Sequence, residues 1–267
     1  MLAPGALDLS LDAPLSAFAE HGYARLGPVL AGDAMRRLRT RADELMLGKV
    51  HYPGMFFQHD SATGRYEDLE FGVGWVGASR AYRKLEKLEL DPLFAAWIQN
   101  PLFGRIASAV LGGEIALYRA VMWNKAPLAG MDLPWHQDDG EFWGLDRPPS
   151  LQIWTALDDA SVDAGCVEVV PGSHRRGLAS RTGGTLQPDR LAELKDHAPP
   201  VMLPVAAGES ILIHNHVWHR SGRNSTASAR RAIGISYLSA ATRCTRKRRA
   251  PREFQRVFEG GSGSRPS

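Results

Sequence analysis

The alternation of apolar and polar positions predicts helices mainly in the first half of the chain. An apolar stripe at helical spacing predicts a helix over residues 34–47, with Asp33 as its N-terminal cap. The stripe consists of Met35, Leu38, Ala42, Leu45 and Met46. Further helices are expected over residues 15–20, 82–88 and 92–111, whereas the residues before about 15 are expected to be loosely ordered.

Short β-branched and aromatic runs, separated by turn residues, make up most of the remaining chain. In the run over residues 114–125, Ile115, Leu117 and Val121 are expected on one face, because alternate side chains of a strand share a face. All the runs predict strands over residues 23–26, 114–125, 151–157, 167–170, 201–205, 209–214 and 231–237. Many short strands with a few flanking helices predict a mainly β fold with a jelly-roll core.

Two stretches have no clear period, and we interpret them as loops that cover a binding site. Residues 51–77 are rich in glycine and aromatic side chains, and residues 175–200 are polar with one helical piece. Long irregular segments in compact domains are often lids or binding loops. His51, His59 and Asp60 in the first stretch are therefore interpreted as loop residues rather than as metal ligands.

A histidine and an aspartate stand two residues apart in the sequence WHQDDG at residues 135–140. In an extended backbone, His136 and Asp138 point to the same face and can reach one ion, while Gln137 points to the other face. The spacing alone is weak evidence, because such triplets occur by chance and often form ordinary surface pairs. A second group of ligands is needed to support a metal site.

Three downstream histidines could supply that second group. His214 and His216 share a face at the end of a predicted strand, and His219 lies just beyond them, so spacing does not choose among the three. Two histidines and one carboxylate on one face of a metal, with other positions open, are typical of non-haem Fe(II) oxygenases. The pattern predicts an iron site, but spacing alone does not identify its second histidine ligand.

Several motifs follow one another in a specific order and spacing. They are His136-Gln137-Asp138, Trp154-Thr155-Ala156-Leu157-Asp158, Gly165-Cys166 through Pro171-Gly172-Ser173-His174, and His219-Arg220-Ser221-Gly222-Arg223-Asn224 followed by Arg230. Together they resemble the phytanoyl-CoA dioxygenase family over about residues 18–238. The resemblance implies a double-stranded β-helix, a cupin-like jelly roll, and it implies that the metal ligands are His136, Asp138 and His219.

The resemblance also implies the cofactors, which are Fe(II), 2-oxoglutarate and O2. Arg230, assisted by Ser221, would hold the distal carboxylate of 2-oxoglutarate, and arginine suits this task because it binds carboxylates in a bidentate way. The cofactor-binding residues expected in all are Lys84, Val121, His136, Gln137, Asp138, Trp154, Ser221 and Arg230. His174 is interpreted as structural, and the presence of Asp138 counts against halogenation, since related halogenases lack this carboxylate.

These residues predict a non-haem iron dioxygenase that oxidises a C–H bond and releases succinate and CO2. Catalysis is assigned to His136, Asp138, His219 and Arg230. The outcome could be hydroxylation, epimerisation, desaturation or ring closure. A cupin-like metal-dependent isomerase or hydrolase is an alternative, although it would not need an arginine and a serine for the co-substrate.

The substrate is expected to be a small molecule, with a secondary metabolite preferred and a fatty acyl-CoA second. Trp135, Phe142 and Trp143, close to the first metal motif, could pack against a ring of the substrate. Asp139 and Glu141 could pair with an amine, which suggests an amino sugar or an alkaloid-like molecule.

The composition is typical of a soluble globular protein. The chain has 267 residues, of which 44% are hydrophobic and 23% charged, with a formal net charge of +3 and a pI near 9.0. One domain is expected over residues 1–258, followed by a flexible tail over residues 259–267. The two cysteines, the N-terminus without a signal peptide and the lack of an apolar run of about 18 residues predict a cytoplasmic protein that neither spans nor binds a membrane.

A basic segment near the C-terminus carries much of the positive charge. It contains Arg243, Arg246, Lys247, Arg248, Arg249 and Arg252. Such a run can bind nucleic acid, but it is more often a solvated segment, so no nucleic-acid partner is expected. The oligomeric state stays open.

Overall fold

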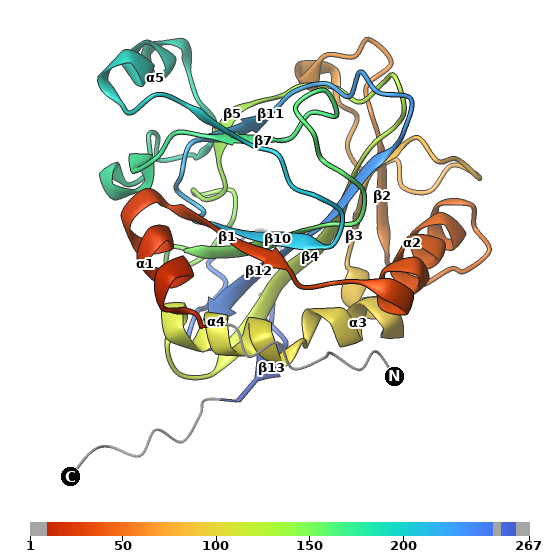
Figure 1. Cartoon of the computed structure of the whole chain (residues 1–267), viewed down its shortest axis with the longest axis horizontal. Helices are drawn as coiled ribbons and strands as arrows, with labels where there is room; N and C mark the ends of the chain where they lie inside the picture. The colour runs from red at the N-terminus through yellow and green to blue at the C-terminus, as the bar shows by residue number, and fades with distance from the viewer. Residues whose placement is uncertain (1–9, 248–251, 260–267) are drawn as a thin grey trace.

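Two antiparallel β-sheets form the core of the protein, and together they make a jelly roll (Figure 1). The computed structural model describes residues 10–247 and 252–259. The larger, eight-stranded sheet contains β1 (Tyr23–Pro28), β2 (Phe56–His59), β3 (Tyr82–Glu86), β4 (Ile115–Lys125), β6 (Leu151–Ala156), β10 (Glu209–Ile213), β12 (Arg230–Ser239) and β13 (Arg256–Phe258). The smaller, five-stranded sheet contains β5 (Leu133–Gln137), β7 (Val167–Val169), β8 (Gly184–Thr185), β9 (Val201–Leu203) and β11 (His219–Ser221).

The order of the strands brings distant segments together. The larger sheet runs β1-β10-β6-β12-β4-β3-β2, with β13 on β4, and the smaller sheet runs β8-β5-β11-β7-β9. The central pair of the larger sheet, β4 and β12, keeps an antiparallel register from Arg230 opposite Lys125 to Ser239 opposite Ile115. This mainly β fold confirms the predicted jelly-roll class.

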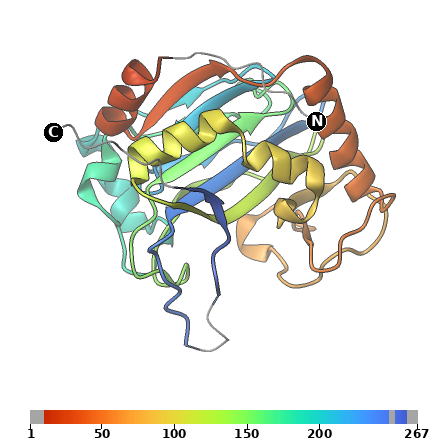
Figure 2. The same cartoon turned by 90° about the horizontal axis from the view of Figure 1, so that it is seen from below.

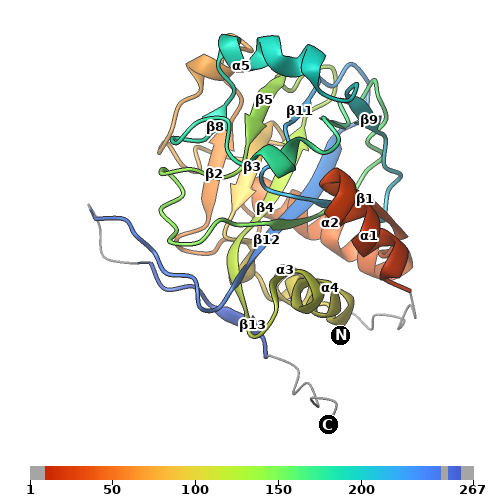
Figure 3. The same cartoon turned by 90° about the vertical axis from the view of Figure 1, so that its left-hand side faces the viewer.

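Helices cover the outer face of the larger sheet (Figures 2 and 3). They are α1 (Asp12–His21), α2 (Gly32–Met46), α3 (Pro92–Ile98) and α4 (Pro101–Leu111). The apolar stripe predicted for α2 is buried and packs in one hydrophobic cluster with residues of β4, β6, β10 and β12. Short helical pieces lie elsewhere, and they are α5 (Pro188–Ala192), η1 (Tyr66–Asp68), η2 (Leu88–Leu90), η3 (Ser173–Arg176) and η4 (Glu193–Asp196).

The predicted helix over residues 82–88 is wrong, because most of this segment is strand β3. Its residues favour a helix locally, but β3 lies between β2 and β4 and forms a ladder with each of them. Tyr82 and Leu85 are fully buried there. Pairing between distant segments overrides local helix propensity at this point. The same pairing creates β2, which lies inside the stretch that the sequence presents as irregular.

Helix boundaries differ from the prediction at three places. The helix expected over residues 92–111 is two helices, since Asn100 caps α4 through the backbone N–H of Leu102 and Pro101 disfavours a helical residue before it. Asp33 lies in the first turn of α2 and makes no capping hydrogen bond. The helix α1 begins at Asp12, within the stretch expected to be loosely ordered, whose residues 1–9 lie outside the described residues.

A bulge in β4 changes which side chains share a face. The register with β12 shifts between Arg119 and Leu117, so one extra residue, Tyr118, interrupts the alternation. Ile115 and Leu117 belong to the core beneath the helices, whereas Val121 follows the alternation of Arg119. The prediction that Ile115, Leu117 and Val121 share one face is therefore wrong.

The C-terminal basic segment is partly integrated into the fold. Arg246 donates to the carbonyl oxygen of Phe142 at 2.9 Å, and Arg252 donates to the carbonyl oxygen of Tyr118. Strand β13 pairs with the first residues of β4 (Figure 2). Arg248, Arg249 and the tail from residue 260 lie outside the described residues, so the predicted division near residue 258 stays a prediction. Over the part of the chain that the structure describes, no helix is long and apolar enough to cross a membrane.

Candidate active site

A cavity of about 250 Å³ lies between the two sheets. Strands β4, β6, β10 and β12 of the larger sheet and β5, β7, β8 and β11 of the smaller sheet contribute side chains to its wall. The stretch predicted to face a substrate contributes Gln58, Asp60, Tyr66, Leu69 and Phe71 to the lining. Part of each predicted cover segment therefore reaches the cavity, since β8 also belongs to the polar excursion over residues 175–200.

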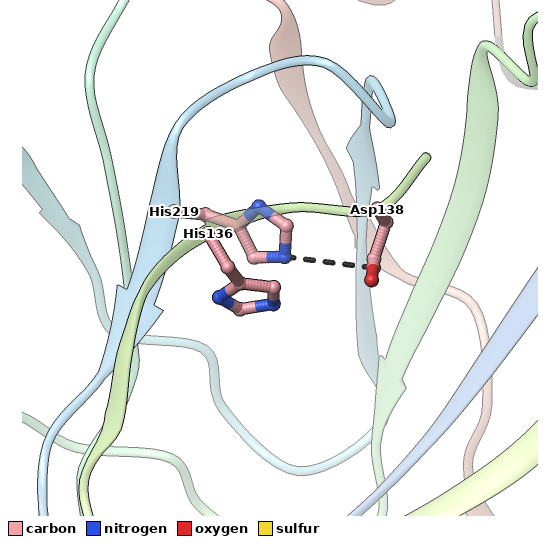
Figure 4. Close-up of side chains that lie close together, drawn as sticks. All are labelled: His136, Asp138 and His219. Atoms are coloured by element: carbon pink, nitrogen blue, oxygen red, sulfur yellow. Dashed lines mark ion pairs between the residues drawn. The ribbon is translucent and has the colours of Figure 1, made fainter. Parts of the chain in front are cut away.

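His136, Asp138 and His219 come together in this cavity (Figure 4). One candidate ligand atom of each residue lies within 4.8 Å of the other two. His136 and His219 are register partners on the antiparallel strands β5 and β11, and Asp138 follows β5 directly. The structure thus selects His219 among the three downstream histidines, because its strand is the one that pairs with the strand of His136.

Each of the two histidines is oriented by its own backbone. The Nδ1 of His136 lies 2.8 Å from the carbonyl oxygen of Pro134, and the Nδ1 of His219 lies 2.9 Å from that of Val217. A carbonyl oxygen can only accept a hydrogen bond, so the Nδ1–H of each ring donates to it and each Nε2 is left for another partner. Burial, together with the nearby His219, lowers the pKa of His136 to about 4, so that its ring is neutral at physiological pH.

Asp138 is held in place by three side chains. Its carboxylate accepts a hydrogen bond from Gln152 at 2.8 Å and lies 3.4 Å from Arg119 and 3.6 Å from the Nε2 of His219 (Figure 4). Burial alone would raise the pKa of Asp138, but the charge of Arg119 and the contact with His219 outweigh it and hold this pKa well below its usual range. Two imidazoles and one carboxylate form a donor set that fits a divalent iron ion.

The other two downstream histidines have different surroundings. His216 pairs with the carboxylate of Asp139 at 2.7 Å, and its backbone N–H donates to the Nδ1 of His214 at 3.0 Å. The ring of His214 packs against Phe18 and His174. None of His174, His214 and His216 lines the cavity.

Arg230 lies at the start of β12 and is only 2% exposed. One of its terminal nitrogens donates to the carbonyl oxygen of Gly165 at 2.8 Å, and its guanidinium lies 5.7 Å from the centre of the Trp154 ring. Its Nε is buried with no hydrogen-bond partner among the described residues. Burial lowers the pKa of Arg230 to about 10, so it remains charged and can still accept an anionic partner.

The remaining predicted cofactor residues differ in their access to the cavity. Trp154 and Ser221 line it, as does Lys84, which stands on β3 and pairs with Glu86 at 2.5 Å. Val121 is buried in β4 and is not part of the lining, so its contact with a co-substrate stays a prediction.

Gln137 uses its side chain for structure. Its amide nitrogen donates to the carbonyl oxygens of Gly177 and His216 at 2.9 and 2.6 Å, and its amide oxygen accepts from the N–H of Ala179 at 2.7 Å. These bonds attach the polar excursion to the end of β5. The side-chain amide is therefore engaged by backbone groups, while Gln137 also lines the cavity, so its contact with the cofactor stays a prediction.

Two expectations about the substrate side of the site are wrong. Asp139 is paired with His216 and Glu141 with Arg181 at the surface, and both acids line a separate depression instead of the cavity. Trp135 packs in another hydrophobic cluster with Val170, Leu186 and Trp218. Phe142 and Trp143 do line the cavity, as expected.

Several lining residues had not been singled out from the sequence, and they are Tyr66, Arg83, Arg119, Trp123 and Gln152. A signal for Arg119 exists in the sequence, because a charge inside a long apolar strand must have a specific partner. The bulge beside Arg119 interrupts the alternation of side chains, so the sequence pattern does not show on which face of β4 Arg119 lies. Tyr66 belongs to an irregular segment, where no period indicates the direction of a side chain.

The sequence matches a family model described as phytanoyl-CoA dioxygenase (PhyH) over residues 18–232. The protein named phytanoyl-CoA dioxygenase 1 from Oryza sativa subsp. japonica is 26% identical over 253 residues, covering 85% of this chain and 88% of its own. L-proline trans-4-hydroxylase from Streptomyces griseoviridis is 27% identical over 172 residues, covering 56% of this chain and 64% of its own.

Solved structures show the same fold. The non-heme alpha ketoglutarate dependent carbocyclase SnoK from nogalamycin biosynthesis superposes with a TM-score of 0.72 at 22% identity, covering 94% of this chain and 96% of its own. EctD from S. alaskensis, crystallised with 2-oxoglutarate and 5-hydroxyectoine, superposes with a TM-score of 0.70 at 22% identity, covering 87% and 77%. The chain belongs to the phytanoyl-CoA dioxygenase family, and it is a non-haem iron oxygenase that depends on 2-oxoglutarate.

Proposed function

We propose that this protein oxidises a C–H bond of a small molecule, preferably a secondary metabolite, and releases succinate and CO2 from 2-oxoglutarate. The observation that carries the proposal is the cavity shared by the triad and Arg230. A donor set for iron and a buried arginine with an unpaired Nε line the same enclosed space. Iron supplies the activation of O2 when it is bound.

The chain's own residues position the reactants. His136, Asp138 and His219 would hold the metal through two Nε2 atoms and one carboxylate. Arg230 would bind the distal carboxylate of 2-oxoglutarate, with the hydroxyl of Ser221 as an additional donor. The indole of Trp154 keeps water away from the guanidinium, which strengthens its attraction for a carboxylate.

Two of the relatives have names that suggest different substrates. The rice relative is named for a fatty acyl-CoA, whereas the Streptomyces relative is named for a free amino acid. The cavity of about 250 Å³ is at the small end of ligand pockets, so the nucleotide part of a coenzyme A ester would have to lie outside it. This size supports a small free substrate over an acyl-CoA.

The proposal is tested by mixing the protein with Fe(II) and 2-oxoglutarate without oxygen and recording the visible charge-transfer band of the chelate. The wild type is expected to show the band, Asp138→Ala to weaken it, and Arg230→Ala to raise the 2-oxoglutarate concentration needed by more than about tenfold. Arg230→Lys keeps the positive charge but loses the bidentate hydrogen bonding of a guanidinium. The 2-oxoglutarate concentration that it needs should therefore lie between those of the wild type and Arg230→Ala. A metal-loaded wild type without band or 2-oxoglutarate binding would favour the cupin-like alternative.

A further inference from the structure

The wall of the cavity carries more positive than negative side chains. Its charged lining residues are Arg83, Lys84, Arg119, Lys125, Arg220 and Arg230 on the positive side and Asp60 and Asp138 on the negative side. An enclosed site with such an excess attracts anions, because the surrounding protein screens charge less than water does.

Three of the cations are neutralised by carboxylates of the protein. Lys84 pairs with Glu86 at 2.5 Å, and Arg220 pairs with Glu168 at the same distance. Arg83 lies 3.3 Å from Asp60. These three pairs add little net charge to the cavity.

Two further cations belong to the co-substrate end. Arg230 is the proposed partner of 2-oxoglutarate, and Lys125 is its register partner across β4 and β12. The ammonium of Lys125 donates to the carbonyl oxygen of Met131 at 2.5 Å. One cation, Arg119, remains to be explained.

Arg119 lies beside the metal triad, and the nearby carboxylate of Glu86 is paired with Lys84. Its one ion-pair partner among the described residues is Asp138 at 3.4 Å, and this carboxylate is a proposed metal ligand. Its guanidinium lies 4.5 Å from the centre of the Trp143 ring, and its side chain is 15% exposed. An aromatic face below and a metal ligand beside it fix the guanidinium so that it faces the cavity.

A second hydrogen-bond donor approaches from the cover segment. Tyr66, on η1, lines the cavity, and its hydroxyl has no hydrogen-bond partner within the described part of the chain. Burial raises the pKa of this hydroxyl, and the charges of Arg83, Asp138 and Arg119 are close enough to act on it. A phenol that stays protonated donates to an anion without adding charge.

We propose that the substrate carries a carboxylate, which binds to Arg119 and Tyr66, and an apolar ring, which packs against the exposed rings of Phe71 and Phe142. This inference rests on the proposed function and names its substrate class. One unbalanced guanidinium matches one carboxylate, and its position beside Asp138 brings the carbons near that carboxylate to the metal. The proposal replaces the expectation of an amine, since the two acids behind that expectation lie outside the cavity.

The test compares matched small molecules that differ only in charge. Arylacetic, benzoic and cycloalkane carboxylic acids, each with its amide and its corresponding amine, are dialysed anaerobically against protein loaded with Fe(II) and 2-oxoglutarate. We expect the carboxylates to bind at least tenfold more tightly than the amides and amines. Arg119→Gln, which keeps a hydrogen bond for Asp138, should abolish this preference, and Arg119→Lys should restore part of it.

Controls separate this inference from the proposed function. Arg181→Ala removes a surface arginine that faces the other depression and should leave the carboxylate preference intact. If wild-type protein forms the chelate band but carboxylates bind no better than amides and amines, or nothing binds, the substrate inference is overturned alone. It is also overturned if Arg119→Gln raises the 2-oxoglutarate requirement as much as Arg230→Ala, because Arg119 then serves the co-substrate. A missing band in wild type refutes the proposed function itself.

Discussion

His136 and His219 face each other across the antiparallel strands β5 and β11, with their ring centres 4.0 Å apart. Each Nδ1 is bound to the carbonyl of the residue two positions before it, so each Nε2 is left for another partner. The pairing of two short strands thus creates a two-histidine site from segments more than 80 residues apart in the sequence. Asp138 completes the site because it is the first residue after the end of β5.

Replacing Asp138 and Asp139 in turn should show which of these two acids binds the metal. Asp138→Ala leaves two imidazoles, and metal affinity should fall by more than the roughly 10–100-fold typical of losing an outer partner. Asp139→Asn breaks the pair with His216 and should retain most of the metal. Metal content after equilibrium dialysis measures both variants, and equal loss in the two would argue against Asp138 as the specific ligand.

Gln137→Ala is expected to lower stability, whereas Ser221→Ala is expected to weaken 2-oxoglutarate binding. Gln137→Ala leaves backbone groups of the polar excursion without partners and should lower the free energy of unfolding by about 2–4 kcal/mol. Ser221→Ala should leave the stability within about 1 kcal/mol and raise the 2-oxoglutarate requirement by roughly 3–10-fold, the loss of one hydrogen bond. Urea unfolding and titration of the chelate band give the two readouts. If Gln137→Ala instead raises the 2-oxoglutarate requirement and leaves the stability unchanged, Gln137 contacts the co-substrate.

Asp91, which caps α3, should contribute far more stability than Asp33, the residue that the sequence predicted as a helix cap. Asp91 is fully buried, accepts from the N–H groups of Leu93 and Phe94, and pairs with Arg41 at 2.5 Å. Asp91→Ala should cost about 2–4 kcal/mol, because it removes the cap of α3 and one of the two carboxylates that bind Arg41, the other being Glu44. Asp33→Ala should cost less than about 0.5 kcal/mol, since Asp33 is exposed and caps nothing. Urea denaturation of both variants tests this difference.

Lys125 should make the stability depend on pH in the alkaline range. Burial, with the charge of Arg230, lowers the pKa of Lys125 to about 7 from the usual 10.5. Between these values the unfolded chain binds a proton that the folded chain does not, so this group makes the free energy of unfolding rise with pH.

Lys125→Met is expected to remove that contribution. The stability of the wild type relative to the variant should rise by at most about 1.4 kcal/mol per pH unit between pH 7 and 10.5 and should be flat below pH 7. Urea unfolding at a series of pH values gives the difference directly. A constant difference across this range would show that the folded protein keeps Lys125 charged.

Local sequence was sufficient for the features that depend on short-range chemistry. The stripe of α2, most strands of the jelly roll and the candidates His136 and Asp138 follow from periodicity and from residue types at fixed spacing, whereas Arg230 was expected from the family resemblance. A period of two or of 3.6 records which side chains must be buried together, whatever they are buried against.

Only the tertiary structure decided the features that depend on distant partners. The register between β5 and β11 places His219, which the resemblance implied but spacing left open, opposite His136, and the ladders with β2 and β4 turn the segment of Lys84 into a strand. The bulge at Tyr118 points Arg119 into the cavity, a change that the sequence pattern does not record. These outcomes come from hydrogen bonds between strands far apart in the chain, and a local pattern contains no information about the register of such bonds.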